Sequence, residues 1–369
     1  MAGEEKIDIP SRSRIHRLRL SLLRVPADAI LVSHLPNIQY LCGFSGSAAA
    51  LLIETSRATL FTDSRYTFQA RAEVTGARVR ISRKGLLQAL AEDLRDRGGR
   101  GRTRVSYAPS QLTVGQLGAL EAASGSRIRW VKSTNVVESL RAVKDSSELV
   151  AIAEACKLIS EVFNGIVRSI RPGITELELA GKIEYAMKKR GAAGPSFETI
   201  VASGARSAWA HAKPTCKLLR KNELVVLDQG AILRGYCSDM TRTVFLGRSS
   251  SKVRRLYQAV LEAQEAARDA IRPGVRADAV DAAARRVLRR HGLSRNFTHS
   301  TGHGLGVEVH ELPRLGRGEP VLLQQGMVLT VEPGVYLEGF GGIRIEDDVV
   351  VTSNGARNLT TSARELLEL

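Results

Sequence analysis

Four acidic residues occupy two β-rich segments of similar design. Residues 223–246 and residues 327–352 each contain two apolar runs around glycines, with an acid in or beside each run. The acids are Asp228 and Asp239 in the first segment and Glu332 and Glu346 in the second. An aspartate beside a run such as Leu-Val-Val-Leu is costly to bury unless its charge is neutralised. The set therefore suggests a shared cation site, whereas any one acid alone could face solvent or pair with arginine.

A glycine-flanked histidine lies between the two segments. His303 stands in Thr-Gly-His-Gly-Leu-Gly, where glycines allow close backbone approach; a tight turn with an incidental histidine is the other interpretation. Carboxylates with one imidazole are ligands for hard or borderline divalent ions. Four acids carry more negative charge than one ion requires, so two bridged ions are indicated. Such a pair activates water and polarises a carbonyl, which predicts hydrolysis of an amide or ester.

Two further histidines are candidates for catalysis. His211 and His310 follow the two copies of an internal repeat at equivalent points, although a single histidine is more often a core or surface residue. His310 begins His-Glu-Leu-Pro-Arg, which lacks the second histidine of the zincin motif HExxH. A serine hydrolase is not indicated, because Gly-Phe-Ser-Gly-Ser at residues 43–47 ends in serine where a nucleophile elbow requires glycine.

The internal repeat organises the C-terminal part of the chain. Residues 170–191 and residues 271–292 begin with Ile-Arg-Pro-Gly, continue as a predicted helix and end with basic residues before a glycine. A long helix over residues 146–169, capped by Ser146 or Ser147, is expected before the first copy. An acid-bearing hairpin follows each copy, so two related halves would each supply two carboxylates to a site on a pseudo-twofold axis.

Residues 11–135 follow a different pattern, in which short strands and helices alternate. This alternation predicts an α/β domain with a mixed sheet. Helices are expected at residues 11–23, 69–73, 86–97 and 114–123, and strands at residues 29–33, 48–54, 58–62, 78–82, 104–108 and 127–131. Pro36-Asn37 is expected to form a turn after the first strand. Neither GxGxxG nor GxxxxGK(S/T) occurs there, so no nucleotide-binding loop is predicted.

Composition bounds the class of protein. The chain has 369 residues, 43% hydrophobic and 25% charged, which indicates a globular protein of two domains. It lacks a signal-peptide core, a membrane-spanning stretch and a CxxC pair, so a cytoplasmic location is expected. The net charge of +16 would suit a nucleic-acid partner. However, the basic runs at residues 12–24 and 285–290 fit solvated faces of amphipathic helices equally well.

The order of these residues resembles the pita-bread metallopeptidases of peptidase family M24, which include aminopeptidase P, prolidase and methionine aminopeptidase. The resemblance is carried by LDQG…YCSDMTRT, STGHGLGVEVHE, TVEPGVY and GGIRIEDDVVVT. PNIQYLCGFSGSAAALLI and LFTDSRYTFQA are similar to the creatinase-type domain of the proline-specific members. The resemblance implies an α/β creatinase-like N-terminal domain over residues 1–137. It further implies an α+β pita-bread catalytic domain, with its pseudo-twofold repeat, over residues 138–369.

The resemblance also implies a ligand set and a metal. Asp228 would ligate one ion, His303 and Glu332 the other, and Asp239 and Glu346 would bridge the two. Glu332 would also handle the catalytic proton. The cofactor implied is a pair of divalent ions, with manganese favoured and cobalt or zinc as alternatives, because an oxygen-rich site with one imidazole is not selective in itself.

Three residues are implied to act beside the ligands. His211 and His310 match histidines that contact substrate and steady the tetrahedral intermediate. Arg344 resembles an arginine that orders the site, although a strand arginine facing solvent is the alternative. The chain departs from the pattern around His211: proline-specific members usually read Pro-His-Gly, whereas this chain reads Ala-His-Ala after Trp209. The departure bears on substrate preference rather than on metal binding.

The function expected from the resemblance is cleavage of the bond between an N-terminal residue and proline. Aminopeptidase P-like action is favoured because Ser-Gly-Ala-Arg-Ser-Ala at residues 203–208 resembles that subgroup. Prolidase action on Xaa-Pro dipeptides is the alternative. Methionine aminopeptidase is less favoured, since it lacks a domain like residues 11–135, and creatinase lacks the metal ligands. A non-catalytic member that binds nucleic acid or protein is a third hypothesis. A homodimer is expected, and a membrane partner is not.

Overall fold

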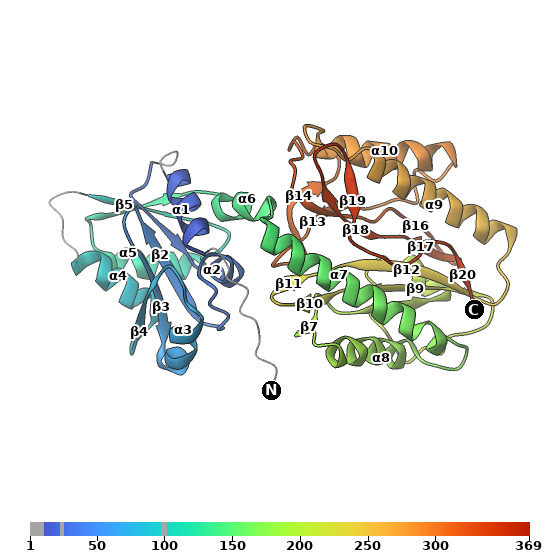
Figure 1. The fold of residues 1–369 in the computed structure, drawn as a ribbon, viewed down its shortest axis with the longest axis horizontal. Coiled ribbons are helices and arrows are strands. Elements are labelled where there is room, and N and C mark those ends of the chain that lie inside the picture. The colour runs from blue at the N-terminus through green and yellow to red at the C-terminus, as the bar shows by residue number, and fades with distance from the viewer. Residues whose placement is uncertain (1–10, 23–25, 97–101) are drawn as a thin grey trace. The chain divides into compact units, whose positions relative to one another are not determined.

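The structure, a computed structural model, describes residues 11–22, 26–96 and 102–369. The chain divides into two compact units, Met1–Arg141 and Ala142–Leu369, whose elements are labelled in Figure 1. Each unit has sheets of its own and buries its own hydrophobic clusters.

The first unit is built on a six-stranded mixed sheet of order β4-β3-β2-β1-β5-β6. Its strands are β1 (Ala29–Val32), β2 (Ala49–Glu54), β3 (Ala58–Asp63), β4 (Arg78–Ser82), β5 (Thr103–Tyr107) and β6 (Ile128–Lys132). Its helices are α1 (Ser11–Leu22), α2 (Leu35–Cys42), η1 (Ser64–Tyr66), α3 (Thr67–Glu73), α4 (Leu86–Asp96), α5 (Val114–Ser124) and α6 (Val136–Ala142). The β1–β2 and β2–β3 pairs are antiparallel and the other three are parallel, which confirms the predicted mixed sheet.

A helix follows the first strand, so the turn predicted at Pro36-Asn37 is wrong. Pro36 lies in the first turn of α2, where its missing N–H needs no acceptor, and Gly43 ends the helix with a φ of 82°. Asn37 is buried, and it donates to the Glu138 carboxylate while its Oδ1 accepts from Arg141. These bonds satisfy the polar atoms of the buried Asn37 side chain within the first unit.

The two basic runs differ in their surroundings. Arg14 of α1 is buried, donates to the Tyr40 carbonyl and lies 4.4 Å from the centroid of the Tyr40 ring, so a solvated face is wrong for this residue. Residues 23–25, where the predicted helix and run end, lie outside the described residues. In the second run, Arg286 is exposed while Val287 and Leu288 are buried, as an amphipathic helix requires.

The second unit contains two pairs of helices. They are α7 (Ser146–Ile166) with α8 (Glu176–Lys189), and α9 (Ser251–Asp269) with α10 (Ala277–Arg290). Short helices η2 (Val167–Ser169) and η3 (Gly204–Ala208) follow α7 and β8. Figure 1 shows α9 and α10 together along one side of this unit and α8 along the opposite side. The cap of α7 is Asp145, which accepts from the Glu148 N–H, so the prediction of Ser146 or Ser147 is wrong by one or two residues.

The strands of the second unit form four sheets. Two of them belong mainly to its first half: β11-β10-β7 and β20-β12-β9-β8. Their strands are β7 (Gly194–Pro195), β8 (Ile200–Ser203), β9 (Glu223–Gln229), β10 (Ala231–Leu233), β11 (Tyr236–Cys237), β12 (Met240–Leu246) and β20 (Leu367–Glu368). The other two are β14-β13-β15-β18-β19 and β16-β17. Their strands are β13 (Gly302–Gly304), β14 (Glu311–Leu315), β15 (Val328–Val331), β16 (Gly334–Leu337), β17 (Gly341–Arg344), β18 (Asp347–Val351) and β19 (Ala356–Asn358).

The central elements of the two halves repeat one another, as the sequence predicts. In the first, antiparallel β9 and β12 enclose the short pair β10–β11; in the second, β15 and β18 enclose β16–β17. The residue before the second helix of each pair makes the same kind of isolated bridge, Thr175 to Leu218 and Arg276 to Leu322. The two acid-bearing hairpins therefore occupy equivalent places in the fold.

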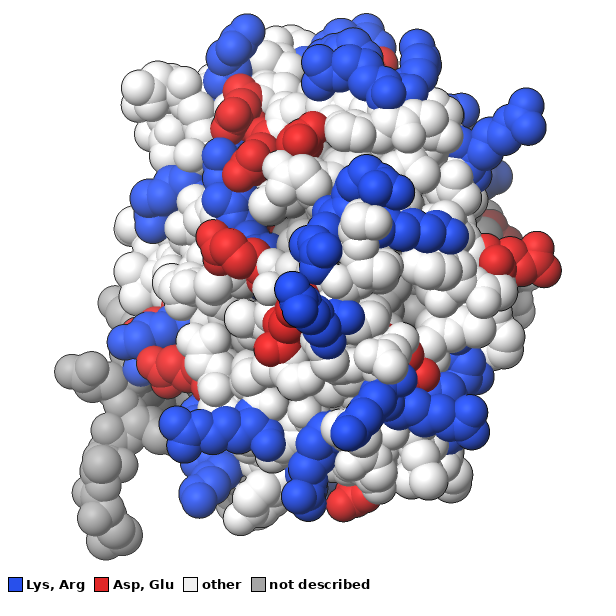
Figure 2. All heavy atoms as spheres, turned by 90° about the vertical axis from the view of Figure 1, so that its right-hand side faces the viewer, with Lys and Arg blue, Asp and Glu red and all other residues white. Residues whose placement is uncertain are grey.

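Positive side chains are dispersed over the face seen in Figure 2. Lysine and arginine form several separate groups there, and acidic side chains stand between them. Exposed ion pairs also occur along helices, as between Lys182 and Glu178 in α8. Among the described residues, no helix combines the length and the apolar character needed to cross a bilayer.

Candidate metal centre

Strand alternation turns the first two acids toward the second half of the unit. In β9, Val225 packs in the cluster built with α7 and α8, whereas Leu224 on the opposite face packs with α9 and α10. Asp228 lies on the same face as Leu224. Its register partner in β12 is Thr241, and Asp239, two residues earlier, points to that same side. The two acids therefore lie close together on one side of the sheet.

The second pair of acids meets the first across the halves. Glu332 follows β15 and Glu346 precedes β18, at the end of an antiparallel pair. Glu346 is 1% exposed, its N–H donates to the Thr241 carbonyl, and its Oε2 accepts from the Thr241 hydroxyl at 2.6 Å. These two bonds join the hairpin of one half to that of the other beside Asp239.

Close backbone packing holds His303 in β13. A Cβ at Gly302 would lie 2.0 Å from the Thr330 carbonyl oxygen, and one at Gly304 would lie 2.1 Å from the Leu312 carbonyl oxygen, so both positions require glycine. Nδ1 of His303 lies 3.0 Å from the Gly304 carbonyl. When Nδ1 carries the proton and donates to that carbonyl, the lone pair of Nε2 is free to bind a cation.

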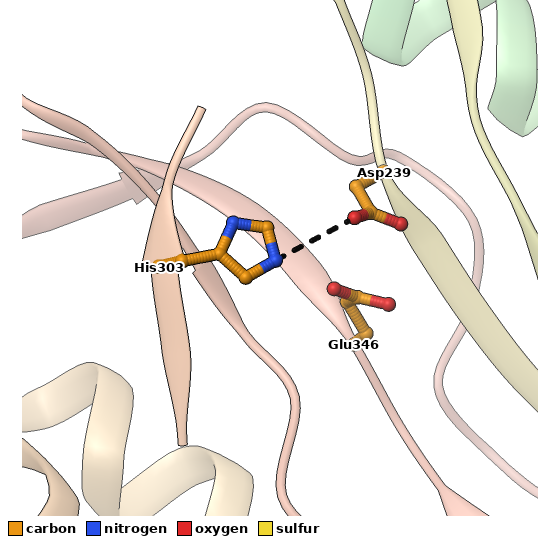
Figure 3. A group of neighbouring side chains, drawn as sticks. All are labelled: Asp239, His303 and Glu346. Carbon is orange, nitrogen blue, oxygen red and sulfur yellow. Dashed lines mark ion pairs between the residues drawn. The ribbon is translucent and has the colours of Figure 1, made fainter. Parts of the chain in front are cut away.

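Asp239, His303 and Glu346 form the tightest group of donors. One ligand atom of each lies within 4.8 Å of the others, and Figure 3 shows the three side chains pointing toward one another. Nε2 of His303 lies 3.8 Å from an Asp239 oxygen, the pair dashed in Figure 3, and 3.5 Å from a Glu332 oxygen. The fifth predicted ligand, Asp228, reaches the same cavity from β9.

Arg344 is buried beside these acids, and its guanidinium donates four hydrogen bonds. Its Nη2 lies 2.5 Å from Oδ2 of Asp228, and its Nε donates to the Thr241 hydroxyl. Its Nη1 donates to the Tyr336 hydroxyl and to the Ala210 carbonyl. The guanidinium thus connects the first acid to the loop that carries His211, and the alternative of a solvent-facing strand arginine is wrong.

Burial, together with the crowding of carboxylates, shifts the pKa of several groups in the site. Burial, with the neighbouring Glu346 and Asp228 carboxylates, raises the pKa of Asp239 well above its usual value. Burial, with the Glu332 and Asp228 carboxylates, raises the pKa of Glu346 in the same way. Burial raises the pKa of Glu332 to about 7. Burial, helped by His310, lowers the pKa of His303 to about 4, so its imidazole is neutral and fit to be a ligand at pH 7.

One cavity brings together all the predicted site residues. It measures about 260 Å³ and is lined by Asp228, Asp239, His303, Glu332, Glu346, His211, His310 and Arg344. His211 and His310 are both exposed, and the rings of His310 and His303 lie 4.4 Å apart, edge to face. Phe197, Ile200 and Val309 add apolar surface. Acids, imidazoles and apolar walls therefore share a single solvent-accessible space.

The residues present fit divalent cations. Oxygen donors with one neutral imidazole are the set that hard and borderline ions prefer. Oδ1 of Asp228 is buried and has no hydrogen-bond partner among the described residues, which is costly unless a cation binds there. Burial and the neighbouring carboxylates raise the pKa of Asp239 and Glu346, and bound cations would favour their ionised forms.

Several contacts of the site were beyond the reach of sequence reasoning. Tyr336 and Thr241 hold Arg344, and Asp348 accepts the Asp239 N–H at 2.8 Å and the Cys156 thiol at 3.1 Å. Thr241 carries a weak signal, because it lies two residues from Asp239 on the same strand face. The others come from distant parts of the chain and carry no local signal.

The family follows from the match of whole domains. The model described as metallopeptidase family M24 matches residues 150–353, and that of the creatinase/prolidase N-terminal domain matches residues 14–143. The chain belongs to metallopeptidase family M24, and its fold is the creatinase-type N-terminal domain followed by the pita-bread catalytic domain.

Individual relatives cover almost the whole chain. An Xaa-Pro dipeptidase of Pyrococcus horikoshii is 35% identical over 92% of this chain and 94% of the relative. The structure of an Xaa-Pro dipeptidase from Bacillus anthracis matches with a TM-score of 0.93 and 36% identity, over 97% of this chain and 100% of that one. An X-Pro aminopeptidase from Thermotoga maritima matches with a TM-score of 0.87 and 36% identity, over 95% and 100%.

Proposed function

We propose that this chain is a dinuclear metal-dependent peptidase that cleaves Xaa-Pro dipeptides. The observation that carries the proposal is the convergence of four acids and one neutral imidazole, from both halves of the second unit, on one cavity. Two of the relatives described above are Xaa-Pro dipeptidases and one is an X-Pro aminopeptidase. The names of these relatives favour dipeptidase action. The sequence of residues 203–208 favours aminopeptidase P-like action instead.

The ligand roles we propose follow the positions of the donors. Asp239 and Glu346, whose carboxylates lie between the two halves, would bridge two cations. Asp228 would complete the coordination of one ion through its Oδ1, which has no hydrogen-bond partner among the described residues. His303 and Glu332 would complete the coordination of the other ion. Manganese is the ion we propose, with cobalt and zinc as alternatives, because the donors are mainly oxygen.

Each remaining residue has a distinct task. When bound, the cation pair lowers the pKa of water to near neutrality and polarises the scissile carbonyl. Glu332, which lines the cavity beside His303, can take up a proton from the attacking water and return it to the proline nitrogen. His211 and His310 stand on exposed lining of the cavity, where they can donate to the carbonyl oxygen as negative charge develops on it.

The size of the cavity supports a short substrate. Pockets that hold drug-sized ligands measure ~300–1,000 Å³, whereas this one measures about 260 Å³. Lys213, which pairs with Glu198 at 2.8 Å, contributes an exposed cation to the lining. Because such an exposed pair is weak, its lysine can exchange partners at little cost. Both features favour a small peptide with its own charged ends.

Substrate length is the decisive test. The protein is loaded with Mn²⁺ and assayed on Xaa-Pro dipeptides, Xaa-Pro-Xaa tripeptides and Xaa-Ala dipeptides of matched first residue. We expect kcat/KM for Xaa-Pro dipeptides to exceed that for tripeptides by at least about tenfold, with Xaa-Ala poorest. A preference for tripeptides would favour the aminopeptidase P-like alternative. No hydrolysis of any proline peptide by metal-loaded protein would reject both.

A further inference from the structure

The loop that carries His211 is held at both ends by one buried carboxylate. Glu176, the first residue of α8, has no solvent exposure. Its Oε1 accepts from the N–H and the hydroxyl of Ser203, both at 2.9 Å. Its Oε2 accepts from the N–H and the hydroxyl of Thr215, at 3.1 and 2.8 Å. Ser203 ends β8 just before the loop, and Thr215 stands four residues after His211.

Arg206 extends this hold to the middle of the loop. Its Nε donates to Oε2 of Glu176 at 3.1 Å, and its Nη2 donates to the Lys213 carbonyl at 2.6 Å. The same guanidinium lies 4.9 Å from the centroid of the Trp209 ring. Trp209 and Lys213 stand two residues on either side of His211, so the arginine spans the histidine's backbone.

We propose that Glu176 is the positioning residue of His211. A buried carboxylate is costly unless its lone pairs are satisfied, and Glu176 satisfies them with five donors from this loop. The two neighbours of the histidine, Ala210 and Ala212, have no polar side chains, and Arg344 holds the Ala210 carbonyl from outside the loop. The inference rests on the proposed function, since it concerns where His211 meets the substrate.

The second half of the second unit contains a comparable buried carboxylate near another histidine. Asp281 of α10 is 1% exposed and accepts from the N–H and the hydroxyl of Thr301, at 3.2 and 2.8 Å. It also accepts from Nε of Arg285 at 2.7 Å. Thr301 precedes His303 by two residues. A buried acid on the second helix of each pair thus fixes a histidine segment, one at the proposed substrate contact and one at the proposed ligand.

The two buried acids support histidines with different proposed roles, so substituting each acid should have a different effect. Glu176→Gln turns an acceptor into an amide that faces five donors, so we expect kcat on Xaa-Pro dipeptides to fall roughly 10- to 100-fold with bound metal per chain unchanged. Glu178→Gln is the matched control: it alters an exposed acid in the same helical turn and should change kcat less than about twofold. Asp281→Asn should instead lower bound metal, and full metal occupancy would overturn its role.

A double-mutant cycle separates positioning from general damage. In a His211→Ala background, which should retain bound metal near wild type, Glu176→Gln should lower kcat by less than about threefold, since the group it places is gone. An equal loss in both backgrounds, or loss of metal in Glu176→Gln, would overturn the proposal. Should Glu176→Gln not fold, Thr215→Val removes one donor and must show the same non-additivity with His211→Ala.

A spectroscopic readout keeps the test independent of catalysis. The chain has two tryptophans, so Trp130→Phe leaves Trp209 as the only reporter of the loop. In that background Glu176→Gln should lower the fluorescence anisotropy of Trp209 and raise its quenching by acrylamide, whereas Glu178→Gln should not. Unchanged anisotropy in Glu176→Gln would count against loop positioning. Wild-type protein inactive on all proline peptides would reject the proposed function alone.

Discussion

Nη2 of Arg344 lies 2.5 Å from Oδ2 of Asp228, while Oδ1 of the same carboxylate is buried without a hydrogen-bond partner among the described residues. The arginine fixes one oxygen of the acid, which leaves the other available to a cation in the cavity that Asp228 lines. Because Arg344 also donates to Thr241, Tyr336 and Ala210, its planar head determines the orientation of the acid as well as balancing its charge.

Arg344→Lys should therefore be far from conservative. A lysine keeps the charge but cannot reproduce four donors in a fixed plane, so we expect kcat/KM on Xaa-Pro dipeptides to fall by about 100-fold or more. Bound metal per chain should fall toward one as Asp228 loses its orientation. Metal analysis and steady-state kinetics on the purified variant check both effects, and wild-type values for both would refute an orienting role.

Removing a bridging acid should be more severe. Asp239→Ala or Glu346→Ala deletes a donor proposed to serve both cations, so turnover should fall below detection and metal binding should weaken. Glu338→Gln is the matched control, because Glu338 is an exposed acid in the turn between β16 and β17. Atomic absorption and peptide assays measure the outcome. Full turnover in either alanine variant would show that the substituted acid does not bridge the two cations.

Above about pH 6.5 the stability of metal-free protein should fall with rising pH. Below that pH His303, whose pKa is lowered to about 4, acts in the opposite direction. The pKa of Glu332 is raised from its usual 4.5 to about 7, so the folded state holds this proton over a range where the unfolded chain has released it. Its contribution to stability is therefore present below about pH 4.5 and lost as pH rises to about 7. The raised pKa values of Asp239 and Glu346 act in the same direction.

Metal should reverse this trend, because cations bind the ionised acids. We expect Mn²⁺ to raise Tm more at pH 7.5 than at pH 5, by a difference on the order of 5 °C. Thermal unfolding of chelated and Mn²⁺-loaded protein across this range measures the effect. An equal rise in Tm at both pH values would show that these acids are not the groups to which metal binding is linked.

A buried ion pair next to His310 offers a test of stability. Nζ of Lys144 lies 3.1 Å from Glu311, and the two side chains are 0% and 4% exposed. Lys144→Met removes the cation of a buried ion pair, so the free energy of unfolding should fall by about 3–5 kcal/mol. Lys157→Met, which removes an exposed pair with Glu161, should cost less than about 0.5 kcal/mol. Urea denaturation compares them; equal losses would refute the desolvation argument.

The main elements of the second unit could be predicted from the sequence because their signals are local. Asp228 stands out as a charge beside an apolar run, and the repeated Ile-Arg-Pro-Gly marks two equivalent helices. The contacts of Arg344 were not open to prediction in the same way. Its partner Thr241 lies 103 residues away in sequence, and only the packing of the two halves brings them together.

Errors arose where one residue type serves two structures. Pro36 marks turns and also the first turn of helices, and the structure uses it in the second way. Arg14 belongs to a basic run, yet it is buried because the Tyr40 carbonyl and ring accept its guanidinium. In both cases contacts with other parts of the first unit determine the structure, and the local sequence pattern does not show those contacts.

The division of the proposed ligands between two halves makes the cation site depend on both of them. Asp228 and Asp239 come from one half, and His303, Glu332 and Glu346 come from the other. Neither portion emerging from the ribosome alone carries a complete cage for cations. The proposed site therefore has all five donors only when both halves have folded and packed against each other.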